Sequence, residues 1–267
     1  MKFLACAAAV SAAGWAAHAA HAQHQGDIGL AVQAGTIITT EITAAGIGAP
    51  RLVFSAQFGN TGSPGFTSDP GFDCSPGTFA VGTRVGFAFA DELLRWDGAT
   101  FVPTNVADPL LGERLRASFL TANATTGAGP VAGFDLAVQS NGGWHRHLSY
   151  TLLPASGQSA PASGVYLLQL TMYSTDPAVG PSQPFALVMA NNAGTEEFAD
   201  AFAAAEALFN PPACPADLDG SGVVDGTDLG LLLGAWGQNG AADLDGSGVV
   251  DGTDLGMLLG SWGACSS

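Results

Sequence analysis

Oxygen-bearing side chains recur at fixed spacing in the last quarter of the chain. Residues 216–230 return unchanged as residues 242–256, a period of 26, and such repetition indicates one structural unit used twice. Counted from the first aspartate of each copy, oxygen donors fall at positions 1, 3, 5, 7, 9 and 12, which is the spacing of a calcium-binding loop. These positions are Asp217, Asp219, Ser221, Val223, Asp225, Asp228, Asp243, Asp245, Ser247, Val249, Asp251 and Asp254.

The chemistry of these donors favours calcium. A hard cation accepts roughly 6–8 oxygen ligands at irregular angles, and position 7 supplies its backbone carbonyl. Zinc and copper would instead prefer His or Cys ligands. Gly222 and Gly248 stand at position 6, where such a loop turns sharply. We therefore expect two calcium ions, one in loop 217–228 and one in loop 243–254, rather than a solvated Asp/Gly linker.

A leucine and tryptophan stripe follows each loop and predicts a short amphipathic helix leaving it. The stripe has the spacing i, i+3, i+4, i+7, and its members are Leu229, Leu232, Leu233, Trp236, Leu255, Leu258, Leu259 and Trp262. Pro215 precedes the first loop, and only residues 237–242 separate the first helix from the second loop. The sequence therefore leaves no room for a helix that enters either loop.

Two calcium loops, each with an exiting helix only, resemble the type I dockerin repeat over residues 214–265. The resemblance implies a small all-α, calcium-dependent docking module at residues 214–267, with the twelve loop positions as ligands and a cohesin-like or other surface protein as partner. It also implies that loop positions 10 and 11 contact the partner. These are Gly226, Thr227, Gly252 and Thr253. Because the two pairs are identical, two faces of the module would look alike to a partner.

The module departs from cellulosomal dockerins in its charge. Position 5 is serine instead of an acid or amide, and residues 214–267 contain eight aspartates but no Lys or Arg. Like charges about 4 Å apart repel by on the order of 1–4 kcal/mol at effective dielectric constants of 80 to 20. We therefore expect the module to loosen or unfold without calcium, whose binding energy becomes folding energy.

Three cysteines remain after a predicted signal sequence at residues 1–22, which has Lys2, an apolar run and a small-residue cleavage site at Ala20–Ala22. Export favours disulfide formation. Three pairings are possible, and Cys214 with Cys265 is favoured because these two bracket the repeats, which leaves Cys74 free or intermolecular. The expected location is secreted or at the cell surface.

The charge of the chain limits its partners. Lys2 is the only lysine, and the net charge is −16, which argues against nucleic acid as a partner. No apolar run after the signal approaches the ~20 residues of a transmembrane helix.

Alternating apolar residues between short Gly, Pro, Asn and Ser clusters predict an antiparallel β-sandwich at residues 23–210. One helix interrupts the pattern, with Thr195 expected as its N-cap, and residues 211–213 form a short Pro linker to the repeats. The expected strands are 27–33, 36–42, 51–56, 84–90, 114–120, 131–138, 146–153, 164–174 and 184–190.

Histidines offer a second metal chemistry in this domain. His145 and His147 are two residues apart, so on a strand both rings point to one face. His24 and Asp27 lie near the expected mature N-terminus. Imidazoles converging on one point would take zinc or copper. The alternative is that these are surface histidines beside Trp144.

Four segments of the domain carry a second resemblance. The start at residues 24–28, the loop at 58–72, the run at 144–152 and the strand at 163–170 resemble uncharacterised exported proteins of planctomycete-type bacteria with an HxH motif. The HxH pattern is also similar to actinobacterial surface-anchored repeats, and this similarity implies metal handling.

Two functions from different classes follow. The first is a non-enzymatic, exported, calcium-binding modular protein, in which a β-sandwich recognition or metal-binding domain is tethered through the dockerin-like module. The alternative is a glycoside hydrolase or carbohydrate-binding protein of polysaccharide breakdown, because dockerins usually accompany such domains. Hydrolysis would need two facing carboxylates. The candidates are Asp91, Glu92, Asp97, Asp108, Glu113 and Asp135.

Overall fold

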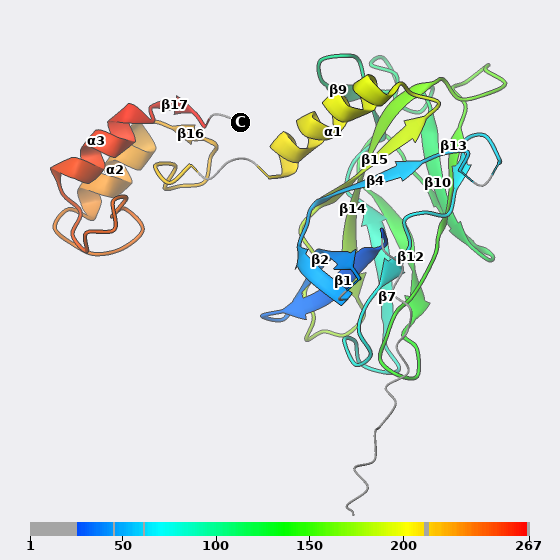
Figure 1. Cartoon of the computed structure of the whole chain (residues 1–267), viewed down its shortest axis with the longest axis horizontal. Coiled ribbons are helices and arrows are strands. Elements are labelled where there is room, and N and C mark those ends of the chain that lie inside the picture. Colours follow the sequence, from blue (N-terminus) through cyan, green and yellow to red (C-terminus); the bar gives the residue numbers. More distant parts are fainter. Residues whose placement is uncertain (1–25, 45, 61, 211–213, 266–267) are drawn as a thin grey trace, which may run out of the picture.

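The computed structural model describes the whole chain except residues 1–25, 45, 61, 211–213 and 266–267. The predicted signal sequence, His24 and the Pro linker lie outside the described residues. The chain is mainly β, as the alternating pattern predicted, and the helices of its described part follow residue 194 (Figure 1). Within the described ranges, no helix is both long and apolar enough to cross a membrane.

Three sheets build the domain that precedes the repeats. The first has the order β3 (Gly46–Pro50), β2 (Thr36–Thr43), β1 (Ile28–Gln33) and β6 (Phe72–Asp73). The second has the order β11 (Ala122–Thr125), β10 (Arg114–Phe119), β13 (Ser149–Leu153) and β5 (Phe66–Thr67). The third has the order β12 (Val131–Ala137), β7 (Arg84–Phe89), β14 (Gly164–Ser174), β15 (Phe185–Asn191) and β4 (Val53–Gln57), with β8 (Leu94–Trp96) on β14 and β9 (Phe101–Pro103) on β8.

Most strand pairs are antiparallel, and the parallel ones are β1 with β6 and β15 with β4. The long strands coincide with the ranges expected from alternation, within a few residues at each end. The strand expected at 146–153 is shorter, because β13 begins at Ser149 and Arg146 contributes one isolated bridge to Phe72. The sequence did not reveal the shortest strands, which are too brief to show a period.

The middle of the third sheet is buried on both faces. Tyr166 and Leu168 of β14 face the main core, which also takes side chains from the other two sheets. The alternate residues Val165 and Leu167 face a second apolar cluster under helix α1 (Thr195–Phe209). Figure 1 shows this helix lying along β15 and β4. Period-two alternation thus divides one strand between two cores.

The start of α1 corrects one expectation. Thr195 was expected as the N-cap, but Gly194 occupies that position and Thr195 is the first helical residue. Phe198 N donates to Gly194 O at 3.0 Å, so the helical hydrogen bonds begin one residue earlier than the side-chain pattern suggested. Gly194 has no side chain to cap the helix, although Glu196 and Glu197 lie in its first turn, as expected.

The repeats form a unit with its own apolar cluster. Helices α2 (Gly226–Gly234) and α3 (Gly252–Gly260) leave the two loops. Strand β16 (Val223–Val224) pairs with β17 (Gly263–Ala264), which follows the other helix. The second copy repeats this exchange, since Gly237 N donates to Val250 O at 2.9 Å and Val250 N to Gln238 O at 2.8 Å. Each loop is therefore completed by the segment after the opposite helix.

The leucine and tryptophan stripe is only partly buried. Leu232 and Leu258 are fully buried, and Leu229 and Leu255 pack beside them. The remaining members were expected on the same face, but they are about half exposed. The tryptophans lie beyond the helices, which end at Gly234 and Gly260, whereas the two leucines lie within the last turn, outside the small apolar cluster. These exposed members are Leu233, Trp236, Leu259 and Trp262.

The free cysteine of the described chain is part of the core. Cys74 is buried, and Trp144 N donates to its Sγ at 3.1 Å. Burial raises the pKa of the Cys74 thiol to about 11. Only the thiolate reacts readily with electrophiles, so this side chain is inert in the folded protein.

We expect iodoacetamide at pH 8 to label Cys74 at least ~100-fold more slowly in folded chain 23–267 than after unfolding. At a pKa of about 11 only ~0.1% of the thiol is ionised at pH 8, against about a quarter at the ordinary pKa of about 8.5. Mass spectrometry counts the labels. The unfolded, unreduced Cys74→Ser variant should take none, and rapid labelling of the folded chain would contradict the buried assignment.

Candidate metal centres

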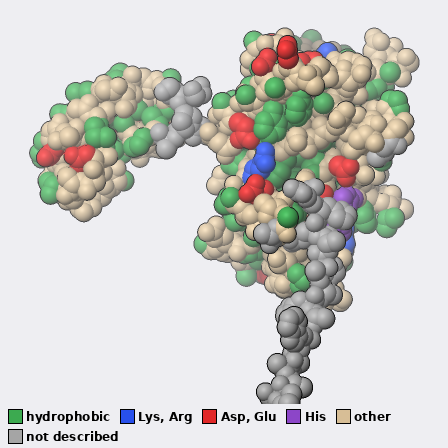
Figure 2. Space-filling view, in the orientation of Figure 1, with side chains coloured by type: hydrophobic (Ala, Val, Ile, Leu, Met, Phe, Trp, Pro, Cys, Tyr) green, Lys and Arg blue, Asp and Glu red, His purple; other side chains and the backbone are tan. Residues whose placement is uncertain are grey.

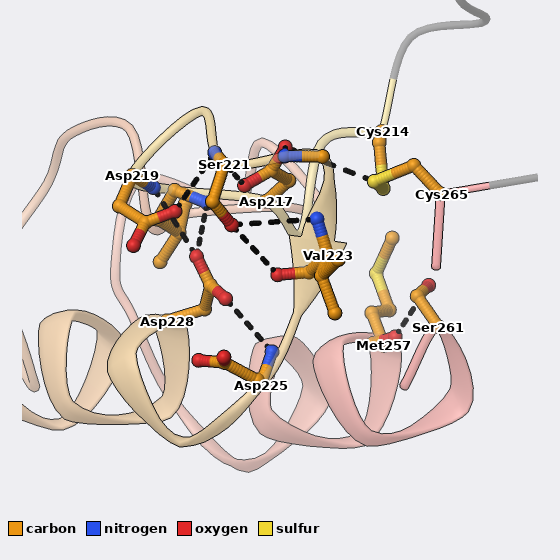
Figure 3. The surroundings of a disulfide bond; sticks show 12 residues. Cys214, Asp217, Asp219, Ser221, Val223, Asp225, Asp228, Met257, Ser261 and Cys265 are labelled. Carbon is orange, nitrogen blue, oxygen red and sulfur yellow. Dashed lines mark hydrogen bonds between the residues drawn. A yellow bond between two sulfur atoms is a disulfide. The ribbon is translucent and has the colours of Figure 1, made fainter. Parts of the chain in front are cut away.

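The first loop gathers oxygen atoms around one point. Carboxylate oxygens of Asp217, Asp219 and Asp228 lie within 4.8 Å of one another. Ser221 N donates to Oδ1 of Asp217 and of Asp219, each at 3.0 Å. The Ser221 hydroxyl lies 3.1 Å from the carbonyl of Val223. Figure 3 shows these five residues around one turn of the chain, so positions 1, 3, 5, 7 and 12 share one region.

Asp228 connects the start of the loop to the start of α2. Its Oδ1 accepts from Leu218 N at 2.7 Å and Asp219 N at 3.2 Å, and its Oδ2 accepts from Asp225 N at 2.8 Å. The side chain is fully buried. The Asp225 N–H, aided by the other two, lowers the pKa of the Asp228 carboxyl despite its burial. This carboxylate therefore stays charged at neutral pH.

Asp225 has a different geometry from the other loop aspartates. It is the N-cap of α2, and its Oδ1 accepts from Thr227 N at 2.7 Å. Its carboxylate is absent from the converging group that the first loop forms. Position 9 of a calcium loop often reaches the ion through a water molecule. Gly226 and Thr227 are exposed beside it at the beginning of the helix.

The second loop repeats this geometry. Asp243, Asp245 and Asp254 form the second converging group. Asp254 accepts from Leu244 N, Asp245 N and Asp251 N, at 2.7, 3.1 and 2.7 Å, and the Asp251 N–H likewise lowers its pKa. The remaining loop positions match their first-copy equivalents: Ser247 with its hydroxyl 3.2 Å from Val249 O, Asp251 as N-cap of α3, and exposed Gly252 and Thr253.

Both loops fit a hard cation. Their donors are carboxylate, hydroxyl and carbonyl oxygens, and the sequence places no Lys or Arg in residues 214–267 to neutralise the carboxylates. Gly222 and Gly248 have φ values of +84° and +94°, which other residues rarely adopt, so position 6 requires glycine. Calcium bound here would supply the missing positive charge.

A disulfide joins the two ends of the repeat unit. It links Cys214 to Cys265, which are 51 residues apart in the sequence (Figure 3). In the chain-entropy model, closing a loop of this length stabilises the folded state by about 4 kcal/mol. The bond therefore supports the unit independently of metal.

A third group of metal-binding side chains lies in the β domain. Asp27, His145 and His147 each offer one ligand atom, and these atoms lie within 4.8 Å of one another. The two imidazole rings are 5.2 Å apart between centroids, at an angle of 61°. The sequence expectation placed His24 with the two histidines, but His24 is outside the described residues, and Asp27 completes the group that the structure shows.

Two further aspartates border this group. Asp73 Oδ2 lies 3.4 Å from His145 Nδ1, and Asp69 Oδ1 lies 3.6 Å from His147 Nδ1. Sequence reasoning assigned neither of them to the site. The only signal for Asp69 was that it lies in loop 58–72, one of the segments of the second resemblance. Asp73 lies just beyond that loop and had no signal, because the pairing that brings β6 to β1 is not local.

Three of the six carboxylates considered for sugar hydrolysis make structural contacts. Asp97 accepts from Ala99 N and Thr100 N in a turn, and these bonds lower its pKa. Asp135 pairs with Arg84, and the buried Glu113 accepts from Ala162 N at 3.2 Å. These contacts explain the three carboxylates without a substrate.

Comparison with known proteins leaves the chain without a family. No protein-family model and no curated protein matches it. Among solved structures, one match is the CooA pilin subunit from enterotoxigenic Escherichia coli, at 10% identity, covering 55% of this chain and 92% of the pilin. The TM-score is 0.23, which is too low to transfer a fold or a function.

We expect Asp228→Asn to weaken one calcium site by about tenfold or more and to leave the other nearly unchanged. The amide has one acceptor oxygen in place of two, so it cannot accept from both ends of the loop. Asp254→Asn should do the same to the second site. Isothermal titration of the full chain measures both affinities, with exposed Gln238→Ala as control. Two unchanged sites in either variant would contradict these roles.

Proposed function

We propose that this chain is an exported, calcium-binding modular protein, in which a β-sandwich domain is held to a partner or to the cell surface by a dockerin-like module. The observation that carries the proposal is the pair of loops, each with converging carboxylates and no basic residue to neutralise them. Calcium binding is the chemistry that satisfies both loops in the same way.

The sandwich assignment is supported by the main core. This cluster takes buried side chains from all three sheets, among them Ile28, Leu115 and Leu168, as expected when sheets pack face to face. Burial on both faces of the third sheet, under the main core and under α1, gives the domain a layered arrangement.

A docking role for the module is supported by its surface. Apolar side chains that remain 42–51% exposed repeat at the 26-residue period on and just beyond the two helices. They are Leu231, Leu233, Trp236, Met257, Leu259 and Trp262. Exposed apolar patches on small soluble units mark interaction sites. The repeated patches would present a partner with two similar faces, next to the exposed glycine and threonine pairs.

Removing calcium should unfold the module. We expect fragment 213–267 in excess chelator to lose most of its helical circular dichroism or to melt well below the calcium-bound form. At free calcium 1,000 times the Kd, each ion stabilises the folded state by about 4 kcal/mol. A fragment carrying Asp217→Asn and Asp243→Asn should respond weakly, and equal melting with calcium and with chelator would refute the calcium assignment. Circular dichroism is preferred because Trp236 and Trp262 are already half exposed.

The proposed tethering role also predicts where the protein is found in the cells that produce it. Full-length protein should remain with the cell-surface fraction, whereas a chain ending at residue 210 should appear in the medium. A charged pair of substitutions, Leu233→Asp with Leu259→Asp, should release the protein without unfolding it, since both side chains are 51% exposed. Immunoblotting of both fractions measures the distribution, with Gln238→Ala as control. Equal surface retention of all variants would exclude docking through this face.

A further inference from the structure

Three short segments that pair side by side position the histidine group of the β domain, which consists of Asp27, His145 and His147. Strand β1 lies parallel to β6 with Ile28 beside Phe72, and Arg146 bridges Phe72 from the other side. Residues in register share a face, and their neighbours along each segment point to the opposite one. Asp27, Asp73 and both histidines are such neighbours, so alternation places them together on the face opposite Phe72.

The hydrogen bonding of His147 prepares one ring nitrogen for a metal. Its Nδ1 lies 3.1 Å from the carbonyl oxygen of Ser68, and a carbonyl can only accept, so Nδ1 carries the hydrogen. The other nitrogen, Nε2, then presents its lone pair toward Asp27 Oδ2 at 3.5 Å. A ring N–H held by a backbone carbonyl is the usual outer-shell arrangement of a metal-binding histidine.

The distances suit two ligands of one ion. Zinc bonds to nitrogen or oxygen of about 2.0–2.2 Å at tetrahedral angles place neighbouring ligand atoms about 3.3–3.5 Å apart. His147 Nε2 and Asp27 Oδ2 have this separation, and both are acceptors that need a cation or a proton between them. The ligand atom of His145 completes a group within 4.8 Å.

The surrounding charge favours a cation. Asp27 and Asp73 are only 5% and 3% exposed, and burying a carboxylate is costly unless its oxygens are compensated. One oxygen of each accepts from a backbone N–H, that of Gly71 or Cys74, and the other faces a histidine. The nearby cation, Arg146, is directed elsewhere, with its guanidinium over the rings of Phe119 and Trp144. The two carboxylates therefore face the imidazoles of His145 and His147 and not the guanidinium of Arg146.

Buried Tyr150 adds an independent observation. Its side chain is fully buried, and its hydroxyl has no hydrogen-bond partner among the residues that the structure describes. A buried hydroxyl without a partner is costly, so this group is available to donate to a water or another polar atom that reaches it.

We propose that Asp27, His145 and His147 bind one divalent transition-metal ion, with zinc the ion that this donor set prefers. The aspartate forms the floor of the site, while the side chains of His145 and His147 are 33% and 28% exposed, so an ion enters from solvent between the rings. Figure 2 shows histidine side chains at the molecular surface near acidic ones. This inference is independent of the dockerin-like module.

Gly71 packs against both Asp27 and the ring of His147 and so fixes their relative positions. Its N–H donates to Asp27 Oδ1 at 2.8 Å, and a Cβ in its place would lie 2.7 Å from Cε1 and 2.8 Å from both nitrogens of His147. Gly71→Ala therefore displaces the ring while every ligand is kept. Gly71 is a positioning residue, and its substitution tests geometry separately from chemistry.

The test is zinc titration of metal-free chain 23–267 in excess calcium, which occupies the repeat loops, with cobalt absorption as the spectroscopic probe. The wild type should bind one zinc outside the calcium loops and show the cobalt spectrum of a mixed nitrogen and oxygen site. His145→Asn with His147→Asn should abolish both signals. Gly71→Ala should weaken binding by about 10–100-fold, the range found when supporting groups are lost, and Asp27→Asn, which removes the charge of a ligand, should weaken it by at least as much. Gly194→Ala, at an open position of ordinary φ, is the matched control and should bind as the wild type does.

The competing reading is that protonated histidines form ion pairs with Asp27, Asp69 and Asp73 and take no metal. In that case zinc uptake would be equal in the wild type and the double histidine variant, and this result would overturn the proposal. A second measurement uses the wild type alone, so its result does not depend on whether the variants fold. Zinc should protect His145 and His147 from diethyl pyrocarbonate, as mapped by mass spectrometry, and full modification at saturating zinc would also overturn it.

Discussion

The pairing of Phe72 with Ile28 on one side and with Arg146 on the other is the constraint on which the β domain depends. It joins three segments that are far apart in the sequence, and it sets two faces at once. Phe72 and Ile28 are completely buried in the main core, while the opposite face collects carboxylates and imidazoles. Because a strand shifted by one residue exchanges its faces, the same register that buries the core also assembles the polar group. Core packing and site geometry therefore cannot vary independently here.

The repeat unit depends on a different balance. Eight carboxylates in 54 residues, with no basic side chain, repel one another, and the small cluster around Leu232 and Leu258 is all the apolar core they share. Backbone N–H groups from the loops and helix starts satisfy Asp228 and Asp254, and the disulfide limits the unfolded ensemble. These interactions organise the loops but leave the net charge unchanged, so a divalent cation remains the natural counter-charge. The β domain and the repeat unit thus rely on apolar burial and on charge compensation respectively.

The sequence alone predicted the features whose pattern lies within a short stretch of consecutive residues. The proposed calcium ligands of each copy lie within twelve consecutive residues, so spacing alone predicted that they converge, and alternation found the long strands because each carries its own period. Asp69 and Asp73 were missed as neighbours of the histidines because only the parallel pairing of a two-residue strand brings them there. Trp236 and Trp262 were placed on the packed stripe because the pattern does not show that the helices end two residues earlier. Non-local pairing and helix length are decided by tertiary packing.

The bond between Cys214 and Cys265 also has a mechanical consequence. Tension transmitted from the β domain reaches the repeat unit at its first residues, and a chain held only by packing would be peeled away from that end. Here the first and last residues are covalently joined, so the load passes into β17 and, through its pairing with β16, into the first calcium loop. Under tension the repeat unit must therefore yield as a whole, instead of opening residue by residue from its first end.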